Sequence, residues 1–217
     1  MEEFEFEFTG STYTLKKYSG SAPKVCIPSS YNGKKVTAIG PYAFFFNETL
    51  KGVTIPSTVT RIEKYAFKNS AIESITIPDW VTFVGYGAFD CCFSLTSVKL
   101  PDNLKVIEGE TFNGCSKLVD ISIPKTVTHI GLNAFGYCSS LEKVTIPSSV
   151  TVIEEDAFRC CSGLKRAVFE HPDGWYLAYR MEDDYGDDLS GEDLEHPPTA
   201  AKMLKNRFVY GNIWKRR

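Results

Sequence analysis

The sequence of 217 residues has no long apolar run. A helix that crosses a membrane needs about 18 or more predominantly apolar residues in a row, and no stretch of this chain approaches that length. The first ten residues, MEEFEFEFTG, alternate acidic and aromatic side chains, whereas a signal peptide starts with basic residues and continues with apolar ones. We therefore expect no membrane insertion, and the chain as given shows no signal peptide.

Basic residues are not gathered where a nucleic acid could use them. The formal net charge is -3, with eight acidic and no basic residues in 182–195 and six basic and no acidic residues in 202–217. Nucleic-acid binding needs Lys and Arg clustered along one face, and the rest of the chain is close to neutral. The sequence predicts no nucleic-acid partner, and we expect the cationic end, WKRR, to be solvated.

Residues for catalysis are equally scarce. The three histidines, His129, His171 and His196, are scattered among unrelated segments, and the stretch GLNAFG at 131–136 lacks the Lys-Ser/Thr of a phosphate-binding loop. The seven cysteines are odd in number and include no Cys-x-x-Cys, so neither a disulfide framework nor a thioredoxin-like motif is indicated. We predict a protein that is not an enzyme, with no catalytic residue, metal or cofactor.

What the sequence does contain is a repeat. Ile-Pro or Leu-Pro recurs every 22 or 23 residues, and a phenylalanine follows each of these prolines by eleven positions. The prolines are Pro56, Pro78, Pro101, Pro124 and Pro147, and the phenylalanines are Phe67, Phe89, Phe112, Phe135 and Phe158. An earlier unit runs from Pro28 to Phe44 with five extra residues, YNGKK. Self-similarity at a fixed period of this length predicts a solenoid of stacked units.

The residue pattern of each unit predicts one coil with two extended segments. In residues 141–158, three apolar residues alternate with polar ones as a half-buried strand requires, and Pro147 ends that strand because it has no N–H group for the ladder. A shorter pair, Val-x-x-Ile, and a closing Ala-Phe turn follow. One coil cannot cover its own apolar face, so stability must come from stacking on its neighbours. At about 4.8 Å per coil, six coils would form a core roughly 25 to 30 Å long.

The order Leu-x-x-Ile-x-Ile-Pro, Val-x-x-Ile, Ala-Phe and Cys-x-x-Leu resembles the leucine-rich repeats of the BspA-like bacterial surface proteins. The resemblance covers nearly the whole chain and includes caps at both ends. It implies an α/β-type, right-handed leucine-rich solenoid, mostly parallel β, with one strand column beside a second column of short strands or turns. One continuous domain would then comprise an N-terminal cap and first repeat (1–49), the repeats (50–169) and a C-terminal cap (170–217).

The C-terminal cap is predicted to hold a helix and an acidic loop. Pro197 and Pro198 suit a helix start before residues 199–208, whose apolar residues share one face. The acidic stretch 182–195 lacks the Asp-x-Asp-x-Asp-Gly pattern of an EF-hand, and its like charges repel one another. We interpret it as a solvated or disordered loop, while cation binding and ordering against the basic final helix stay open.

Four cysteines share one repeat position, three residues after the phenylalanine: Cys92, Cys115, Cys138 and Cys161. This is the inward Asn or Cys column of leucine-rich repeats. Four residues in a straight column span roughly 14 Å, whereas a zinc site needs four sulfurs about 2.3 Å from one point, so we interpret them as buried, reduced thiols. Cys91 and Cys160 share another position, and Cys26 lies in the first coil. A reducing compartment fits best, and a surface protein with buried thiols stays open.

Aromatic residues are in excess in one coil. Trp80, Phe83 and Tyr86 stand where other units carry mostly small, polar or charged residues. Exposed aromatic groups often mark contact sites, and we predict these three as the partner-binding residues, with Phe45 and Phe46 as a weaker candidate. Cover by the C-terminal tail or by a second copy, or local packing of the rings, stays open. The face of the first strand column, by contrast, is hydroxyl-rich and is expected to lack aromatic anchors.

These observations lead to the hypothesis of a non-enzymatic protein-binding module, because solenoids present long regular faces to partners. The resemblance implies cell adhesion or recognition of a host protein at a bacterial surface or after secretion, with matrix proteins such as fibronectin among the partners. The alternative is an intracellular scaffold or assembly protein that uses the same repeats. The sequence leaves the localisation, the partner, the binding face and the oligomeric state open.

Overall fold

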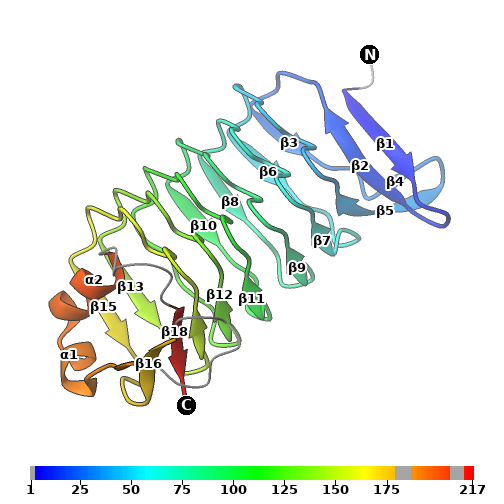
Figure 1. Cartoon of the computed structure of the whole chain (residues 1–217). Helices are drawn as coiled ribbons and strands as arrows, with labels where there is room; N and C mark the ends of the chain where they lie inside the picture. Colours follow the sequence, from blue (N-terminus) through cyan, green and yellow to red (C-terminus); the bar gives the residue numbers. More distant parts are fainter. Residues whose placement is uncertain (1–2, 179–186, 206–212) are drawn as a thin grey trace.

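The computed structural model of the chain describes residues 3–178, 187–205 and 213–217. The chain winds into an elongated parallel β-solenoid of about seven turns (Figure 1). Strand β1 (Phe4–Phe8) lies at one end and two short helices lie at the other. The predicted solenoid of stacked, mostly parallel β coils is confirmed.

The first side of the solenoid carries one strand from most coils. Its strands pair in parallel and keep equivalent repeat positions side by side, so that Ile75 lies opposite Val98 and Val144 opposite Ala167. In the coil between β10 and β13 the equivalent residues, 120–122, form no strand. The strands are β3 (Lys24–Cys26), β6 (Gly52–Thr54), β8 (Ser74–Thr76), β10 (Ser97–Lys99), β13 (Lys143–Ile146) and β15 (Arg166–Phe169).

The second side begins with the six-residue β5 (Lys34–Ile39) and continues with strands of two residues, the short strands that the repeat pattern predicted. They are β7 (Arg61–Ile62), β9 (Phe83–Val84), β11 (Val106–Ile107), β12 (His129–Ile130) and β14 (Val152–Ile153). The inserted residues YNGKK form an antiparallel hairpin between β4 (Ser30–Tyr31) and β5. Its turn residues Asn32 and Gly33 both have positive φ, 46° and 75°, as an Asn-Gly hairpin turn requires.

The third side contains no strand within the described residues, yet backbone hydrogen bonds join its coils just as regularly. Around Phe67, the N–H groups of Tyr65, Phe67 and Asn69 donate to carbonyls of the next coil at 2.8 to 3.0 Å. Tyr65 and Asn69 both adopt the left-handed conformation, with φ of 57°. Most of the other coils repeat this pattern with non-glycine residues, although such residues adopt it at an energetic cost.

The repeated phenylalanines form one continuous stack through the core. Neighbouring ring centroids lie 4.8 to 5.6 Å apart, and the planes differ by at most 14°. The ring of Tyr18 covers the N-terminal end of the stack, tilted by 45° and with its centroid 5.5 Å from that of Phe44. Each stacked phenylalanine is almost fully buried. The core therefore requires each coil to place its phenylalanine ring directly over the ring of the preceding coil. The stack consists of Phe44, Phe67, Phe89, Phe112, Phe135 and Phe158.

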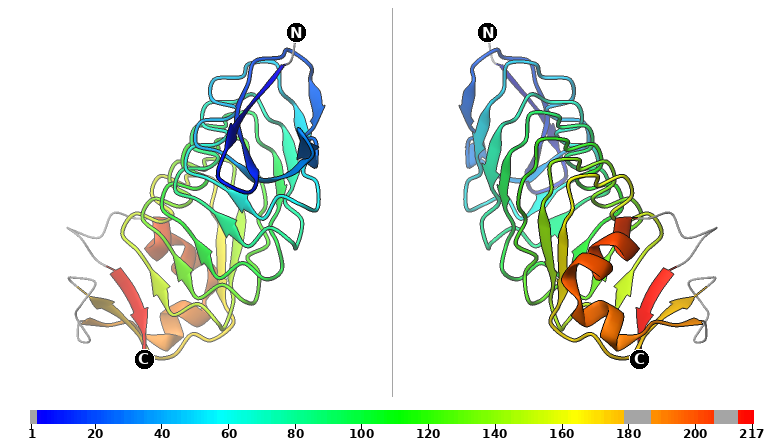
Figure 2. Two further views of the ribbon diagram at one scale, coloured as in Figure 1. Left: turned by 90° about the vertical axis from the view of Figure 1, so that its right-hand side faces the viewer. Right: turned by 90° about the vertical axis from the view of Figure 1, so that its left-hand side faces the viewer.

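Both ends of the solenoid are closed. At the N-terminal end β2 (Tyr13–Tyr18) runs parallel to β5, and β1 pairs with β2 in antiparallel fashion. At the C-terminal end β18 (Ile213–Arg216) lies antiparallel between β14 and β16 (Trp175–Ala178). Helices α1 (Gly191–Glu195) and α2 (Pro197–Lys205) pack on β15, as Figure 2 shows at the lower end of the molecule.

Three expectations for the C-terminal cap need correction. The helix begins at Pro197 rather than at residue 199, and residues 206–208 lie outside the described residues. The acidic stretch is not simply a solvated loop, because β17 (Asp187–Asp188) pairs with β16 and Leu194 of α1 is buried; residues 182–186 lie outside the described part. The WKRR end is not merely solvated, because its Trp214 is buried in β18.

Replacement of Phe112 by Ala should lower the free energy of unfolding by about 3 to 5 kcal/mol, because it leaves a ring-sized void in the middle of the stack. Urea denaturation followed by circular dichroism measures this loss. The matched control is Phe93→Ala, whose ring is 55% exposed and whose removal should change stability by at most about 0.5 kcal/mol. Equal losses in both variants would contradict the role assigned to the stack.

Candidate functional site

A groove runs along the first strand column. It consists of three depressions, with volumes of about 830, 380 and 630 Å³ from the N-terminal to the C-terminal end. The first two depressions share the residues of β10, and the last two share Asp102, Asp120, Ser122 and Pro124. The depressions therefore form one continuous surface over the strands.

The chemistry of this groove changes along its length. Over β3 to β10 its lining combines small hydroxyl side chains with Lys24 and Lys99 and contains no acidic side chain. The C-terminal depression contains three acidic residues, Asp102, Asp120 and Glu170, together with two lysines. The groove therefore offers hydrogen-bonding groups throughout, with basic charge at one end and mixed charge at the other.

Trp80 forms part of the wall of the first depression. Its indole Nε1 donates a hydrogen bond to the carbonyl of Pro56 in the previous coil, at 3.0 Å. The side chain is still 44% exposed. The expectation that the sheet face lacks an aromatic anchor is therefore wrong at this position, because the corner after Pro78 directs the indole back over the preceding coil.

The other two predicted site residues lie on different surfaces. Phe83 belongs to β9 in the second column, where the guanidinium of Arg61 lies 4.1 Å from its ring centroid. Tyr86 follows β9 and packs edge-on against Tyr65, with ring centroids 5.7 Å apart. Burial is the main cause that raises the pKa of Tyr86, and a hydrogen bond with Glu110 is the second. No ring contact joins Trp80, Phe83 and Tyr86 to one another among the described side chains.

Tyr86 instead ends a chain of aromatic contacts on the third side. Tyr65 stacks on Tyr42 at 5.3 Å, Tyr42 meets Phe45 at 5.4 Å, and Phe45 meets Phe46 at 4.8 Å. Tyr42, Phe45 and Phe46 are exposed. The weaker candidate from the sequence, Phe45 and Phe46, thus belongs to a larger aromatic surface than the sequence pattern indicated, because contacts across coils are not visible in one repeat.

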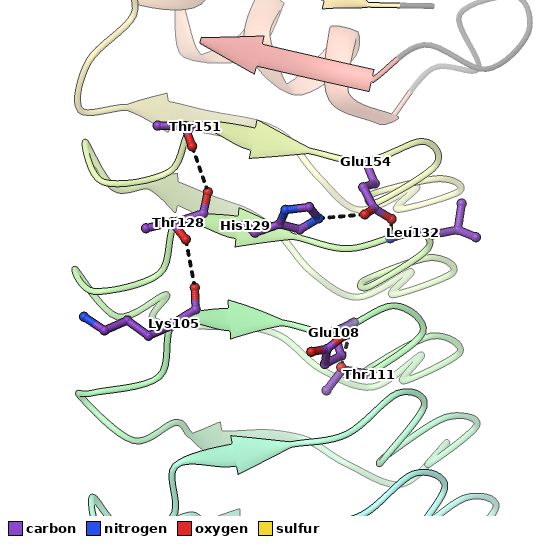
Figure 3. Close-up of polar contacts among 8 residues, drawn as sticks. All are labelled: Lys105, Glu108, Thr111, Thr128, His129, Leu132, Thr151 and Glu154. Atoms are coloured by element: carbon purple, nitrogen blue, oxygen red, sulfur yellow. Dashed lines mark hydrogen bonds and ion pairs between the residues drawn. The ribbon is translucent and has the colours of Figure 1, made fainter. Parts of the chain in front are cut away.

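His129 has a local partner in the next coil. Its Nε2 lies 2.7 Å from Oε1 of Glu154, and Oε2 of the same carboxylate accepts a hydrogen bond from the N–H of Leu132 at 2.7 Å. Figure 3 shows this pair beside a row of threonine hydroxyls, in which Thr151 bonds to the carbonyl of Thr128. These contacts join adjacent coils, and Glu154 holds the imidazole on the outer face of the second column.

The column cysteines serve the coil-to-coil contacts. Each thiol donates to the carbonyl of the stacked phenylalanine in the preceding coil; for example, Cys92 Sγ lies 3.0 Å from Phe67 O. The other three distances are 3.3, 3.2 and 3.0 Å, for Cys115, Cys138 and Cys161. All four side chains are buried, and all seven cysteines are free. The predicted column of buried, reduced thiols is therefore present.

Burial makes these thiols poor nucleophiles. It raises the pKa of Cys92 and Cys161 to about 12, and that of Cys115 and Cys138 well above the ordinary value of 9.0. Cys91 lies outside this column and donates to Oδ1 of Asp90 at 3.4 Å. Burial and the nearby Asp90 charge raise its pKa to about 11. Because the thiolate is the reactive form, the geometry supports a packing role for all five.

Clusters of metal ligands and membrane-spanning helices are absent from the part of the chain that the structure describes. The side chains in residues 3–178, 187–205 and 213–217 include no group of three or more His, Cys, Asp or Glu placed to hold a metal ion. Among the helices of the same ranges, none is long and apolar enough to cross a membrane.

The strand columns, the phenylalanine stack and the inward Cys column together define a leucine-rich repeat solenoid. A family model described as BspA type Leucine rich repeat region matches six copies of the repeat within residues 35–165. This match spans more than half of the chain, which therefore belongs to the BspA-type leucine-rich repeat family. Repeats of this family form protein-interaction modules. No curated protein matches the chain significantly.

Solved structures of bacterial leucine-rich repeat proteins are similar to the chain. A leucine rich cell surface protein from Faecalibacterium prausnitzii is 26% identical, with a TM-score of 0.60 over 85% of this chain and 59% of its own. The T. pallidum leucine-rich repeat protein is 28% identical, with a TM-score of 0.52 over 76% of this chain and 68% of its own. A protein from Eubacterium ventriosum is 24% identical, with a TM-score of 0.58 over 85% of this chain and 55% of its own, and shows the fold alone. The chain thus spans less than two thirds of two of these relatives.

The buried thiols predict a loss of stability at high pH. A raised folded-state pKa means that the contribution of Cys92 is complete below its unfolded pKa near 9 and is lost as the pH rises toward 12. The free energy of unfolding should therefore fall between these values, and Cys92→Ser should make the fall shallower by about 1.4 kcal/mol per pH unit.

Serine suits this test because Ser70 already occupies the equivalent position in the preceding coil and is buried. Urea denaturation at several pH values provides the measurement. Cys26→Ser is the matched control, because Cys26 is exposed in the folded protein, and it should keep the wild-type slope. If Cys92→Ser also kept that slope, burial of the thiol would not control the alkaline transition.

Proposed function

We propose that the chain recognises a protein at a bacterial surface, as an adhesion or host-protein-binding module, and that the groove of the first strand column receives the partner. The observation that carries the proposal is the place of Trp80, which combines exposure with a fixed orientation at the groove wall. Tryptophan is enriched among the residues that dominate binding energies at protein interfaces. An indole already held by Pro56 O loses little conformational freedom when a partner binds.

The groove also suits a protein ligand by its chemistry. Thr54, Ser74, Thr76 and Ser97 provide donors and acceptors beside the apolar wall of Trp80, and protein interfaces combine a buried apolar centre with a polar rim. The Faecalibacterium prausnitzii relative is a cell surface protein, which supports surface display of this chain. Matrix proteins such as fibronectin, implied by the family resemblance, are the first partners to test.

The alternative function, an intracellular scaffold, is favoured by one observation. Four buried thiols donate to carbonyl groups of the repeat core, and unmodified thiols are typical of reducing compartments. Treatment of intact expressing cells with a protease separates the two functions. Digestion of the chain on intact cells supports surface display, whereas protection until the cells are lysed supports the scaffold.

Trp80→Ser should weaken binding to immobilised fibronectin about 30-fold or more, as expected for a central interface residue. Surface plasmon resonance gives the dissociation constants, and circular dichroism checks that the variants are folded. The matched control is Tyr137→Ser, because Tyr137 is 47% exposed on the third side, away from the groove.

The same assay tests the other predicted residues, Phe83 and Tyr86, one at a time. Because they lie outside the groove, their replacement by Ser should have less effect than that of Trp80. A larger loss in Tyr86→Ser than in Trp80→Ser would move the binding site to the aromatic surface of the third side. Absence of any binding by the wild-type chain would contradict recognition of fibronectin.

A further inference from the structure

Strand β1 ends the sheet of the N-terminal cap, and β2 is its one strand neighbour within the described residues. Hydrogen bonds near its two ends show which backbone groups face β2. Ser19 N donates to Glu3 O at 2.8 Å. At the hairpin, Thr9 N donates to Thr12 O at 2.9 Å. The odd-numbered residues at both ends of β1 thus direct their backbone groups toward β2.

The even-numbered residues of β1 have the opposite orientation. Successive residues of a strand direct their N–H and C=O groups alternately to the two sides. The backbone groups of Phe4, Phe6 and Phe8 therefore point away from β2, along the outer edge of the cap. Such an edge can accept one more strand from another chain.

The side chains hold this edge in a strand conformation before any partner arrives. The ring of Phe4 lies 5.0 Å from that of Tyr18, and the ring of Phe6 stacks on Tyr31 at 4.5 Å. Both phenylalanines pack against the hydrophobic core. A preformed strand reduces the conformational entropy that binding would cost.

The opposite face of β1 is acidic. Glu5 and Glu7 are exposed, and neither carboxylate has an ion pair with any described residue. Across the β1–β2 pair, Glu5 is opposite Lys17. Opposite charges on directly facing strand residues are favourable, and like charges are unfavourable. A strand added at the free edge would thus be favoured if it placed basic residues beside Glu5 and Glu7.

The same rule disfavours a second copy of this chain at the edge. In a symmetric antiparallel pair of β1 strands, the glutamates of both copies would lie opposite one another on one face, which is unfavourable. An acidic edge of this kind therefore discourages self-association. It remains complementary to a basic strand from a different protein.

We propose that the free edge of β1 binds an extended segment of another protein that carries Lys or Arg at alternate positions, by addition of a β-strand. The bound segment receives backbone hydrogen bonds from Phe4, Phe6 and Phe8 and places its basic side chains beside Glu5 and Glu7. This surface lies at the N-terminal end of the solenoid and is separate from the groove with Trp80.

The test uses the full chain and a fluorescent seven-residue peptide that alternates Lys and Val, with fluorescence anisotropy as the readout. The wild-type chain should bind this peptide at least about tenfold more tightly than a peptide that alternates Glu and Val. One peptide is methylated on its valine nitrogens and a second on its lysine nitrogens. One of these two methylations should abolish binding, because every second N–H group of the added strand pairs with the edge.

Two charge variants complete the design. Glu5→Lys/Glu7→Lys should reverse the preference between the two peptides, whereas Glu48→Lys/Glu195→Lys, with the same change in net charge at exposed positions elsewhere, should keep the wild-type preference. If both variants changed their preference between the two peptides equally, overall charge would explain the preference and the proposal would be overturned. Unchanged binding of both methylated peptides, or no binding of the Lys-Val peptide to the wild-type chain, would overturn it as well.

Loss of peptide binding would leave the groove unaffected, because Trp80 does not contribute to this edge. Trp80→Ser should therefore bind the Lys-Val peptide like the wild-type chain. This comparison distinguishes failure of the strand-addition proposal from failure of the groove proposal.

Discussion

The stacking of one coil on the next at a constant separation is the constraint on which the structure depends. Strands in a sheet lie about 4.8 Å apart, and the stacked phenylalanine rings lie 4.8 to 5.6 Å apart. The strand separation and the ring separation can both be satisfied only if the phenylalanine occupies the equivalent position in every coil. The period of 22 or 23 residues satisfies this requirement. Hydrogen bonds of the third side and of the buried thiols then join the same coils.

This constraint separates the residues that build the molecule from those available for binding. Inward positions are occupied by phenylalanine, aliphatic residues and thiols that contact the neighbouring coils, so little chemical variation is open to them. Outward positions have no such restriction, and there the chain differs from one coil to the next. Trp80 at the groove and the aromatic rings of Tyr42, Phe45 and Phe46 are such differences. The proposed recognition therefore uses the outer surfaces, while the core keeps them in fixed relative positions.

Much of the fold was predictable from the sequence, because residues that share a position in the repeat occupy equivalent places in successive coils. The strand columns and the phenylalanine column follow from spacing, and the inward direction of the cysteine column follows from the resemblance to leucine-rich repeats. The left-handed residues of the third side, such as Tyr65 and Cys91, were not predictable, because they are not glycines and their conformation is imposed by hydrogen bonds to the next coil. The helix α1 was missed because its buried Leu194 stands among acidic residues.

The candidate site was less predictable than the fold. The excess of aromatic residues between Pro78 and Phe89 is visible in one coil, but the direction of each side chain depends on the corner that it occupies. Trp80 is held toward the preceding coil by Pro56, Phe83 lies beneath Arg61, and Tyr86 contacts Tyr65. Each of these contacts joins two coils, and such contacts cannot be predicted from the spacing of residues within one repeat.

The central claim is that the coil is an interchangeable unit whose stability comes from its neighbours. It is tested most directly by deletion of residues 113–135, which removes one period of 23 residues and joins Phe112 to Gly136 in register. Urea denaturation should show a cooperative transition with a smaller slope, since less surface is exposed on unfolding. Deletion of residues 113–124 removes half a period and should prevent folding. Failure of both proteins to fold, or equal stability of both, would contradict the account.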